Sequence, residues 1–279
     1  MNPGLYVVAT PIGNLNDITA RALSVLREAD LIACEDTRVT GALLHRFGID
    51  TRLMPYHDHN AEAARPKIMA QLAAGGRVAL VSDAGTPLIS DPGYKLVRAC
   101  ANAGVPVVPV PGPSALLAAL VTAGLPTDRV MFAGFLPHKS GARRATLLEF
   151  KDLKATLVFY ESAQRLPESL ADFAAVLGAR EAAVCRELTK LYEEIRRGTL
   201  TDLATAYAAE GSPKGEVVIV VGGAPDAVTS AEDLDTALRR ALASMTVRDA
   251  SDMVAEAFDE PRRRIYQRAL ELSKDAPPR

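Results

Sequence analysis

The chain has 279 residues, of which 48% are hydrophobic and 24% are charged, and its formal net charge is -2 at pH 7. These values exclude a disordered chain and favour two domains. They provide no overall positive field for nucleic acid, so an RNA substrate would depend on a local basic patch. The three cysteines lack a CxxC or Cys/His spacing, which indicates reduced thiols in a cytoplasmic protein and no metal site.

Residues 105–124 form the most apolar window of the sequence. Four prolines interrupt it, at positions 106, 109, 111 and 113. A lipid-exposed helix could not satisfy its backbone groups there, so we expect no membrane span. No basic leader precedes the first apolar run, so we expect no secretory signal.

The first 124 residues alternate short apolar runs with helical patterns. Such alternation predicts an N-terminal α/β domain, 1–124, with a mostly parallel sheet that is covered on both faces. The predicted strands are 5–9, 31–34, 78–81 and 105–110, and the predicted helices are 19–29, 61–73, 94–103 and 114–123. In such sheets a ligand binds beyond the carboxyl ends of the strands, where this chain has Gly/Pro-rich turns.

A turn at 124–128 separates this segment from a second predicted α/β domain, 125–225. Its strands are expected at 130–134, 156–160, 182–185, 194–197 and 217–221, and its helices at 142–150, 166–176 and 200–209. The short connections between the later strands predict a mixed sheet. Beyond Pro225 the pattern predicts a C-terminal helical segment, 226–279, with helices at 231–244, 247–258 and 261–273.

Several common sites are absent from the sequence. It contains no GxxxxGK[ST], no GxGxxG after the first strand and no GxSxG, which argues against a P-loop nucleotidase, a dinucleotide site and an α/β-hydrolase. His57-Asp58-His59 lacks a third metal ligand at a suitable spacing, and a solvated loop is the better interpretation.

The loop 82–93, Ser-Asp-Ala-Gly-Thr-Pro-Leu-Ile-Ser-Asp-Pro-Gly, follows a buried strand. Its small residues would let a ligand approach the backbone, while Asp83, Asp91 and three hydroxyls offer polar contacts. The alternative is a long turn in which the two carboxylates satisfy local amides. A second loop, 111–115, places a helix N-terminus at the same edge of the sheet, which suits a polar ligand.

Taken together, these segments resemble a known family. The words at 10–15 (TPIGNL), 35–38 (EDTR), 82–93 and 110–115 (VPGPSA) are similar to those of the tetrapyrrole methylase superfamily. The words at 134–137 (GFLP), 159–162 (FYES), 186–190 (RELTK) and 214–216 (KGE) resemble its ribosomal RNA small subunit methyltransferase I branch. The match runs in order from about residue 5 to residue 221, and several ordered words are far more specific than one.

The resemblance implies a two-domain tetrapyrrole-methylase-like fold with S-adenosyl-L-methionine in the cleft between the domains. It implies methyl transfer to the ribose 2′-hydroxyl of a cytidine in small-subunit (16S) ribosomal RNA, within the 30S particle, by a homodimer. The cofactor-binding residues carried over by motif are Pro11, Asp83, Ala84, Gly85, Thr86, Ile89, Ser114, Ala115, Tyr160, Glu161, Leu188, Pro213, Lys214 and Gly215. Gly85-Thr86-Pro87 stands where tetrapyrrole enzymes tend to have Gly-Asp-Pro, which favours the RNA branch.

The implied reaction is in-line attack of the ribose oxygen on a sulfonium methyl group. A general base would assist this poor nucleophile. Asp36 and Glu35 are the catalytic residues we expect, since they follow a strand beside the cofactor loop. The alternative for this pair is a structural carboxylate tied to Arg38.

Local positive charge for RNA is available in two places, which are Lys139 with Arg143 and Arg144, and Arg262 with Arg263 and Arg264. A solvated helix start would explain the second cluster equally well. Two other functions remain open. One is methylation of a tetrapyrrole, precorrin or diphthine-type substrate, and the other is a cofactor-binding or RNA-binding module without catalysis.

Overall fold

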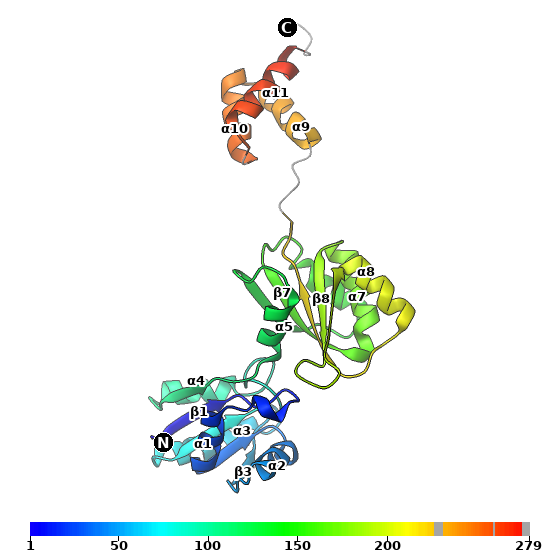
Figure 1. Ribbon diagram of the computed structural model, residues 1–279. Coiled ribbons are helices and arrows are strands. Elements are labelled where there is room, and N and C mark those ends of the chain that lie inside the picture. Colours follow the sequence, from blue (N-terminus) through cyan, green and yellow to red (C-terminus); the bar gives the residue numbers. More distant parts are fainter. Residues whose placement is uncertain (226–230, 259, 275–279) are drawn as a thin grey trace. The chain divides into compact units, whose positions relative to one another are not determined.

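The structure is a computed structural model that describes residues 1–225, 231–258 and 260–274. The chain forms two compact units, Met1–Ala224 and Pro225–Arg279 (Figure 1). The second unit begins next to the predicted start of the C-terminal segment, of which residues 226–230, 259 and 275–279 lie outside the described residues. Among the described residues, no helix has the length and apolar character needed to cross a membrane.

The first sheet of the larger unit is entirely parallel, as predicted. Its strand order is β3-β2-β4-β1-β5. The strands are β1 (Gly4–Val8), β2 (Leu31–Cys34), β3 (Leu53–Pro55), β4 (Arg77–Val81) and β5 (Val107–Val110). The helices are α1 (Ala20–Glu28), α2 (Thr37–Arg46), α3 (Ala61–Ala73), α4 (Tyr94–Asn102) and α5 (Ala115–Ala123), with a short 3-10 turn at Leu15–Asp17.

Helices cover both faces of this sheet because alternate strand residues point to opposite sides. Val8 and Ile32 pack with α1 and α2, whereas Leu5, Leu31 and Ala33 pack with α3 and α4. The continuous apolar strands of the sequence therefore have the two-sided burial expected of a parallel sheet.

The sequence analysis did not predict α2 or β3. The α2 segment contains Gly41 and β-branched residues, which weaken its intrinsic helical signal. Its start depends on the Asp36 side chain, which accepts a hydrogen bond from the amide of Arg38. The β3 strand has only three residues and ends in Pro55, so it fits an edge position.

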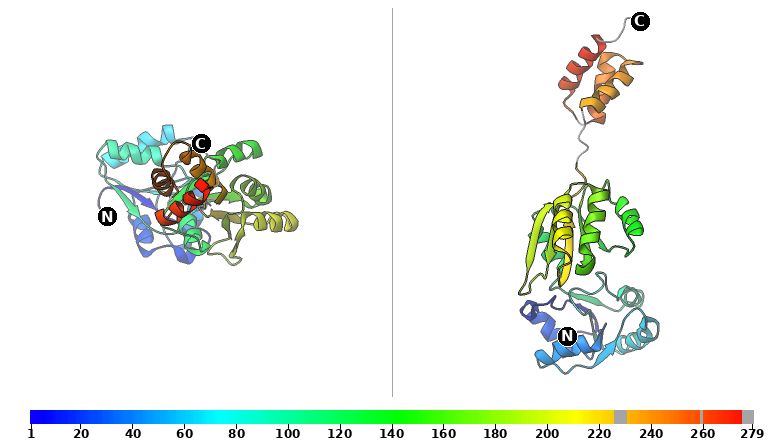
Figure 2. Two further views of the ribbon diagram at one scale, coloured as in Figure 1. Left: turned by 90° about the horizontal axis from the view of Figure 1, so that it is seen from above. Right: turned by 90° about the vertical axis from the view of Figure 1, so that its right-hand side faces the viewer.

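The second sheet is mixed, as predicted, with the order β6-β7-β10-β8-β9. Only β6 and β7 pair in parallel. The strands are β6 (Val130–Phe135), β7 (Thr156–Ser162), β8 (Glu181–Arg186), β9 (Glu194–Thr199) and β10 (Glu216–Val221). The helices are α6 (Ser140–Leu148), α7 (Leu166–Leu177) and α8 (Leu200–Glu210), with a 3-10 turn at Ala163–Arg165. These three helices gather on one face of the sheet, as can be followed in Figure 2.

Helix α5 covers the other face of the second sheet. Ala119, Leu120 and Ala123 share an apolar cluster with residues of β7, β8 and β10, and Ile12 of the first loop joins it. The two sheets therefore belong to one compact unit. The division of that unit into domains 1–124 and 125–225 stays a prediction.

The smaller unit contains the three predicted helices, α9 (Ala231–Leu242), α10 (Val247–Ala257) and α11 (Arg262–Lys274). Leu238, Val254, Ile265 and Ala269 belong to its own apolar core. Thr246 caps α10 by accepting a hydrogen bond from the amide of Asp249. The unit thus has the internal packing of a small helical domain.

Candidate active site

A cavity of about 530 Å³ lies between the two sheets of the larger unit, and we call it the central cavity. It opens at the carboxyl ends of β2, β4 and β5, where a parallel sheet binds ligands. From the first sheet it is lined by Ile12, Glu35, Asp83, Ala84, Gly85, Thr86, Ile89, Ser90, Asp91, Ser114 and Ala115. From the second sheet it is lined by Phe135, Tyr160, Glu161, Ser162, Ala163, Cys185, Leu188, Gly215, Glu216, Val217 and Val218.

The loop 82–93 forms one wall of the central cavity, and its backbone is held by neighbouring loops. The backbone of Gly85 exchanges two hydrogen bonds with that of Thr10, at 2.9 and 3.0 Å. The Thr86 hydroxyl donates to the carbonyl of Pro113 at 3.1 Å, which ties the loop to the start of α5. Gly85 has a positive φ of 76°, and a Cβ there would lie 3.3 Å from Ile12 Cγ2. A side chain is therefore excluded at this point of the wall.

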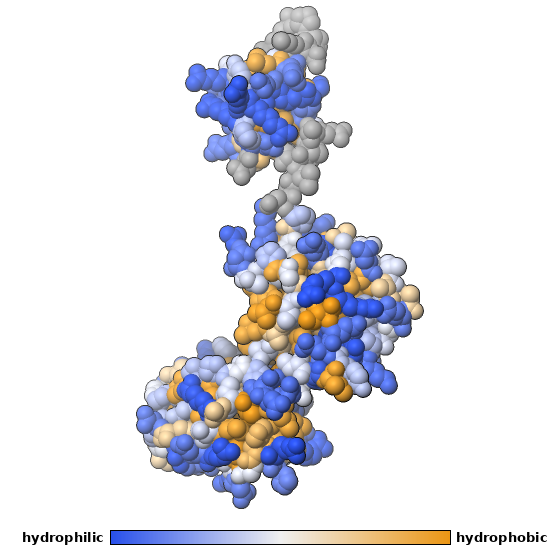
Figure 3. All heavy atoms as spheres, in the orientation of Figure 1, coloured by the Kyte–Doolittle hydropathy of each residue, from blue (hydrophilic) through white to orange (hydrophobic). Residues whose placement is uncertain are grey.

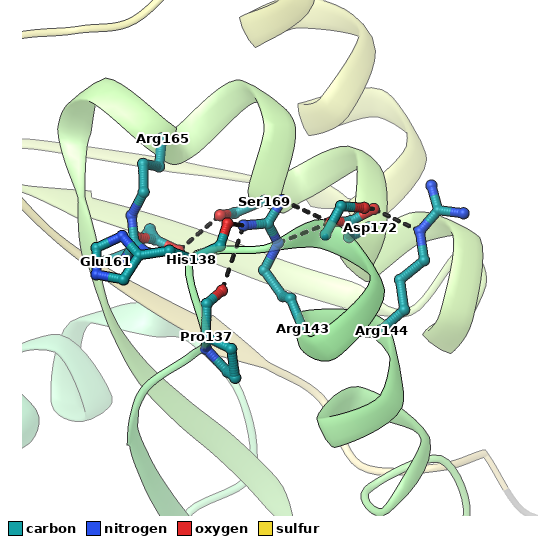
Figure 4. A network of polar contacts seen from close by, with 9 residues as sticks. Pro137, His138, Arg143, Arg144, Glu161, Arg165, Ser169 and Asp172 are labelled. Atoms are coloured by element: carbon teal, nitrogen blue, oxygen red, sulfur yellow. Dashed lines mark hydrogen bonds and ion pairs between the residues drawn. The ribbon is translucent and has the colours of Figure 1, made fainter.

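The opposite wall consists of aromatic and buried polar residues of the second sheet. Tyr160 stands between Phe132 and Phe135, with ring centroids 4.9 and 5.5 Å apart in edge-on contacts. Glu161 is only 4% exposed and accepts hydrogen bonds from the Ser169 hydroxyl at 2.6 Å and from the Ser162 amide at 2.7 Å. It also pairs with Arg165 at 2.5 Å (Figure 4). Since these partners occupy both of its carboxylate oxygens, Glu161 is held as part of the wall.

Glu35 and Asp36 are neighbours in the sequence but have opposite environments. Hydrogen bonds from the Arg38 side chain and amide lower the pKa of Asp36 to about 2. Burial raises the pKa of Glu35, and the charges of Asp83, Asp91 and Asp58 raise it further. Only Glu35 of the two lines the central cavity. The Asp36 carboxylate is thus tied to Arg38, and a catalytic role for either residue stays a prediction.

Comparison with known proteins matches residues 4–204 to the model of the tetrapyrrole (corrin/porphyrin) methylases and residues 228–273 to that of the RsmI C-terminal HTH domain. The chain belongs to the tetrapyrrole methylase family. The resemblance inferred from the sequence motifs is thereby confirmed.

Curated relatives match almost the whole chain. A protein of Mesorhizobium japonicum named ribosomal RNA small subunit methyltransferase I is 52% identical over 273 residues, which are 98% of this chain and 93% of that protein. A protein of Escherichia coli O157:H7 with the same name is 48% identical over 273 residues, covering 96% of this chain and 94% of the relative.

Solved structures of the family share the fold at low sequence identity. Diphthine synthase superposes with a TM-score of 0.62 at 17% identity, covering 78% of this chain and 89% of its own. The cobalt precorrin-4 methyltransferase CbiF superposes with a TM-score of 0.57 at 20% identity, covering 78% and 94%. These superpositions confirm the predicted two-sheet α/β fold.

The central cavity of this tetrapyrrole methylase brings together most of the cofactor-binding residues predicted from the sequence. Pro11 lines an adjoining cavity instead. Pro213 and Lys214 line none of the three cavities described in this article, although Gly215 next to them lines the central one. The predicted residues that line the central cavity are Asp83, Ala84, Gly85, Thr86, Ile89, Ser114, Ala115, Tyr160, Glu161, Leu188 and Gly215.

The structure corrects the prediction that Arg143 contacts RNA. Its side chain is 1% exposed and pairs with the buried Asp172 at 2.6 Å (Figure 4). Burial opposes the charge of Asp172, yet hydrogen bonds from Arg144, Ser140 and Arg143 hold its pKa below the usual range. Arg144 is half exposed and reaches the same carboxylate at 2.5 Å, whereas Lys139 is exposed at the start of α6. Of the two adjacent arginines, Arg143 is therefore part of a buried ion pair.

The loop between β8 and β9, residues 187–193, begins within the word RELTK at 186–190, but Leu188 was its one residue predicted to bind the cofactor. Lys190 donates to Glu187 at 2.8 Å and to Glu216 at 2.9 Å. Burial opposes the charge of Lys190, but these hydrogen bonds raise its pKa. Glu187 and Thr189 both have positive φ, 50° and 65°. The segment contains no glycine or proline, so its composition gave no signal for these backbone conformations.

The three arginines at 262–264 open α11, as predicted, and all are exposed. Arg262 pairs with Asp252 of α10, and Arg264 pairs with Glu260 at 2.8 Å. Within the described part of the chain, no carboxylate oxygen lies within 4.0 Å of the Arg263 guanidinium to form an ion pair. The cluster is thus partly neutralised by its own unit.

Proposed function

We propose that this chain is an S-adenosyl-L-methionine-dependent methyltransferase that methylates the ribose 2′-hydroxyl of a cytidine in small-subunit (16S) ribosomal RNA. The observation that carries the proposal is the central cavity, in which residues from all eight of the sequence words that carry the family resemblance line one space. The name shared by the relatives at 52% and 48% identity supports the RNA substrate.

The residues of the central cavity fit the proposed cofactor. Ala84 and Gly85 leave room for close approach to the backbone, and a Cβ at Gly85 would enter this space near Ile12. Ile89 and Leu188 offer apolar surface for an adenine, while carboxylates from the first sheet suit a ligand that carries positive charge. S-adenosylmethionine, when bound, supplies a sulfonium methyl group and leaves as a neutral thioether.

Glu35 is the general base in this proposal. Its raised pKa brings a carboxylate closer to the pKa that proton transfer requires near neutral pH. It takes the proton of the ribose hydroxyl as the new oxygen–carbon bond forms, and no second charged group needs to be generated. Asp36 holds the start of α2 and keeps Glu35 at the cavity wall. Alignment of the two reactants contributes the rest of the acceleration.

We place RNA contacts at the exposed cations Lys139, Arg144 and Arg263, with Arg262 and Arg264 beside the last. They lie on both compact units, and the C-terminal unit matches a family of HTH domains. Helices of that class contact nucleic acid through exposed basic residues. The partner is the 30S particle, which locates the enzyme in the cytoplasm.

We also propose that two copies associate through α5 and β6. Leu117 and Val121 of α5 are 56% and 75% exposed, and Val130 and Met131 of the edge strand β6 are about two fifths exposed. Figure 3 shows hydrophobic side chains gathered around the position of α5. A contiguous apolar surface of this kind is typical of a protein interface. Val121→Asp should convert a dimer to a monomer in sedimentation experiments.

The decisive experiment supplies methyl-labelled cofactor to the protein together with isolated 30S subunits, naked 16S RNA or a precorrin, followed by nucleoside analysis. The proposal expects labelled 2′-O-methylcytidine from the small-subunit substrate. A labelled base would reject the reaction, and label on the precorrin alone would favour the tetrapyrrole alternative. Cofactor binding without transfer to any substrate would favour a module that lacks catalysis.

A further inference from the structure

Two further cavities continue the central cavity toward the protein surface. A middle cavity of about 440 Å³ shares Asp83 and Ala84 with the central one. An outer cavity of about 700 Å³ shares Gly13, Arg46 and Lys190 with the middle one. The three cavities therefore adjoin one another, and together they lead from the outer cavity to the proposed cofactor site.

The outer end of this path is bordered by exposed apolar residues at the tip of the β8–β9 loop. Leu191 lines the outer cavity and is 88% exposed, and Tyr192 beside it is 70% exposed. Neither residue belongs to an apolar cluster of the fold among the described residues. Because neither side chain is buried against the rest of the fold, we explain their exposure by a ligand that binds at the cavity mouth.

The loop that carries this tip is held in one conformation. The Lys190 stem lies against the backbone of Gly13, where an added Cβ would come within 2.3 Å of Lys190 Cε. Its ammonium group binds Glu187 and Glu216, as described above. The amide of Thr189 donates to Glu193 at 2.6 Å. A preorganised tip loses little conformational freedom when a ligand binds.

The polar groups of the path indicate what the ligand is. Arg46 lines the middle and outer cavities without an ion pair in the described part of the chain, and the charge of Lys190 is balanced by two carboxylates. The Thr189 hydroxyl, which also lines the outer cavity, is buried with no hydrogen-bond partner in the structure. One free cation, an unpaired hydroxyl and an exposed aromatic tip fit a nucleotide strand better than a polycarboxylate, which would need several cations.

We propose that Tyr192, Leu191 and Arg46 form a binding surface for the single-stranded RNA that flanks the methylated nucleotide. Tyr192 stacks on a neighbouring base with Leu191 beside it, and Arg46 pairs with a backbone phosphate. The target nucleotide then enters the middle cavity, which leads to Asp83 and the cofactor loop. This inference rests on the proposed function, because it assumes an RNA substrate.

The test compares KM for 30S subunits, kcat and cofactor affinity among single variants of the full chain. Tyr192→Ala and Arg46→Gln should each raise KM by about tenfold with unchanged cofactor affinity. Tyr192→Phe should retain the wild-type KM, because a phenyl ring also stacks. Arg46→Gln should in addition reduce the salt dependence of binding by about one phosphate contact. Matched controls are Leu148→Ala, a 56% exposed apolar residue of α6, and Arg21→Gln, an exposed arginine of α1.

An unchanged KM for both Tyr192→Ala and Arg46→Gln would overturn the inference. A change of oligomeric state in Tyr192→Ala would also overturn it, because the tip would then belong to a contact with a second copy. A photo-crosslinking residue at position 192 separates this inference from the proposed function. Crosslinks to ribosomal RNA support the surface even if no methyl is transferred, and methyl transfer without such crosslinks contradicts the surface alone.

Discussion

The loops 82–93 and 187–193 both contribute to the wall of the central cavity, one from each sheet, and they are built by different means. Among the described residues, the four non-glycine residues with positive φ are Leu88 and Ser90 in the loop 82–93 and Glu187 and Thr189 in the loop 187–193. The first loop is held by backbone hydrogen bonds to Thr10 and by small residues. The second is held by charged side chains around Lys190.

The two loops also shift the pKa values of nearby carboxyl groups in opposite directions. After burial itself, Asp83 and Asp91 of the first loop raise the pKa of Glu35. Lys190 of the second loop lowers the pKa of Glu187 through a hydrogen bond. In the proposed function, the first loop tunes the pKa of the general base, and the second loop holds the proposed RNA-binding surface in one conformation.

The largest expected effect is on the proposed general base, Glu35. Glu35→Gln should lower kcat by about 10²–10⁴-fold, the usual contribution of a general base, with little change in cofactor affinity. Asp36→Asn is the matched control, because asparagine also caps helices and should leave kcat within a few-fold of wild type. Equal losses of kcat in the two variants would contradict the assignment of Glu35.

The pH profile of kcat tests whether neighbouring carboxylates raise the pKa of Glu35. Because the pKa of Glu35 is raised, its carboxylate forms at a higher pH than that of an ordinary glutamate, and the acidic limb of kcat should lie correspondingly higher. Asp83→Asn removes one of the charges responsible and should move that limb to lower pH. A limb that stays in place, measured on 30S subunits at saturating cofactor, would show that another group controls it.

The next largest effect is expected for Gly85→Val, which disturbs the backbone of the loop 82–93. A side chain at φ 76° is strained, and its Cβ would lie 3.3 Å from Ile12 Cγ2 at the cavity wall. We expect cofactor affinity to fall by about 100-fold in calorimetry, equivalent to about 2.7 kcal/mol. Gly141→Ala, in open space on α6, should bind the cofactor like wild type.

A smaller effect is expected in the second loop. Glu187→Gln weakens the contacts with Lys190 and the Glu216 amide and should lower the free energy of unfolding by about 1–3 kcal/mol in denaturant titrations. Since the folded pKa of Glu187 is lowered from 4.5, its stabilisation is full above that value and is lost as the pH falls through the lowered pKa. The difference between variant and wild type should therefore shrink in acid; a constant difference would exclude charge as its cause.

The smallest effect concerns backbone strain, which both loops share. Ser90→Gly and Thr189→Gly should each raise the free energy of unfolding by up to about 1 kcal/mol, because glycine accepts positive φ. The gain should be larger for Thr189, which is β-branched and loses an unpaired hydroxyl. Ala101→Gly in α4 is the opposite control and should lose about 1 kcal/mol. A lower free energy of unfolding for Ser90→Gly or Thr189→Gly would mean that the replaced side chain stabilises its loop.

Much of the fold could be predicted because it depends on local patterns. Apolar runs such as 31–34 and 78–81 are continuous because both faces of a parallel strand are buried. The loop 82–93 was recognisable because its glycines and prolines meet local backbone requirements. In contrast, α2 needed a cap and a packing partner, and the second loop needed Gly13 and Glu216, which lie far away in the sequence.

The sequence by itself determined that the chain alternates strands and helices, that Gly/Pro-rich loops follow its parallel strands, and that its motifs are those of the methylase family. Only the tertiary structure distinguished the environments of Glu35 and Asp36, because Asp83 and Asp91, which raise the pKa of Glu35, lie near residue 85 rather than beside it. It likewise buried Arg143 against Asp172, 29 residues further along. Neighbouring residues determine periodicity and backbone requirements, whereas burial and charge pairing depend on which distant segments the fold brings together.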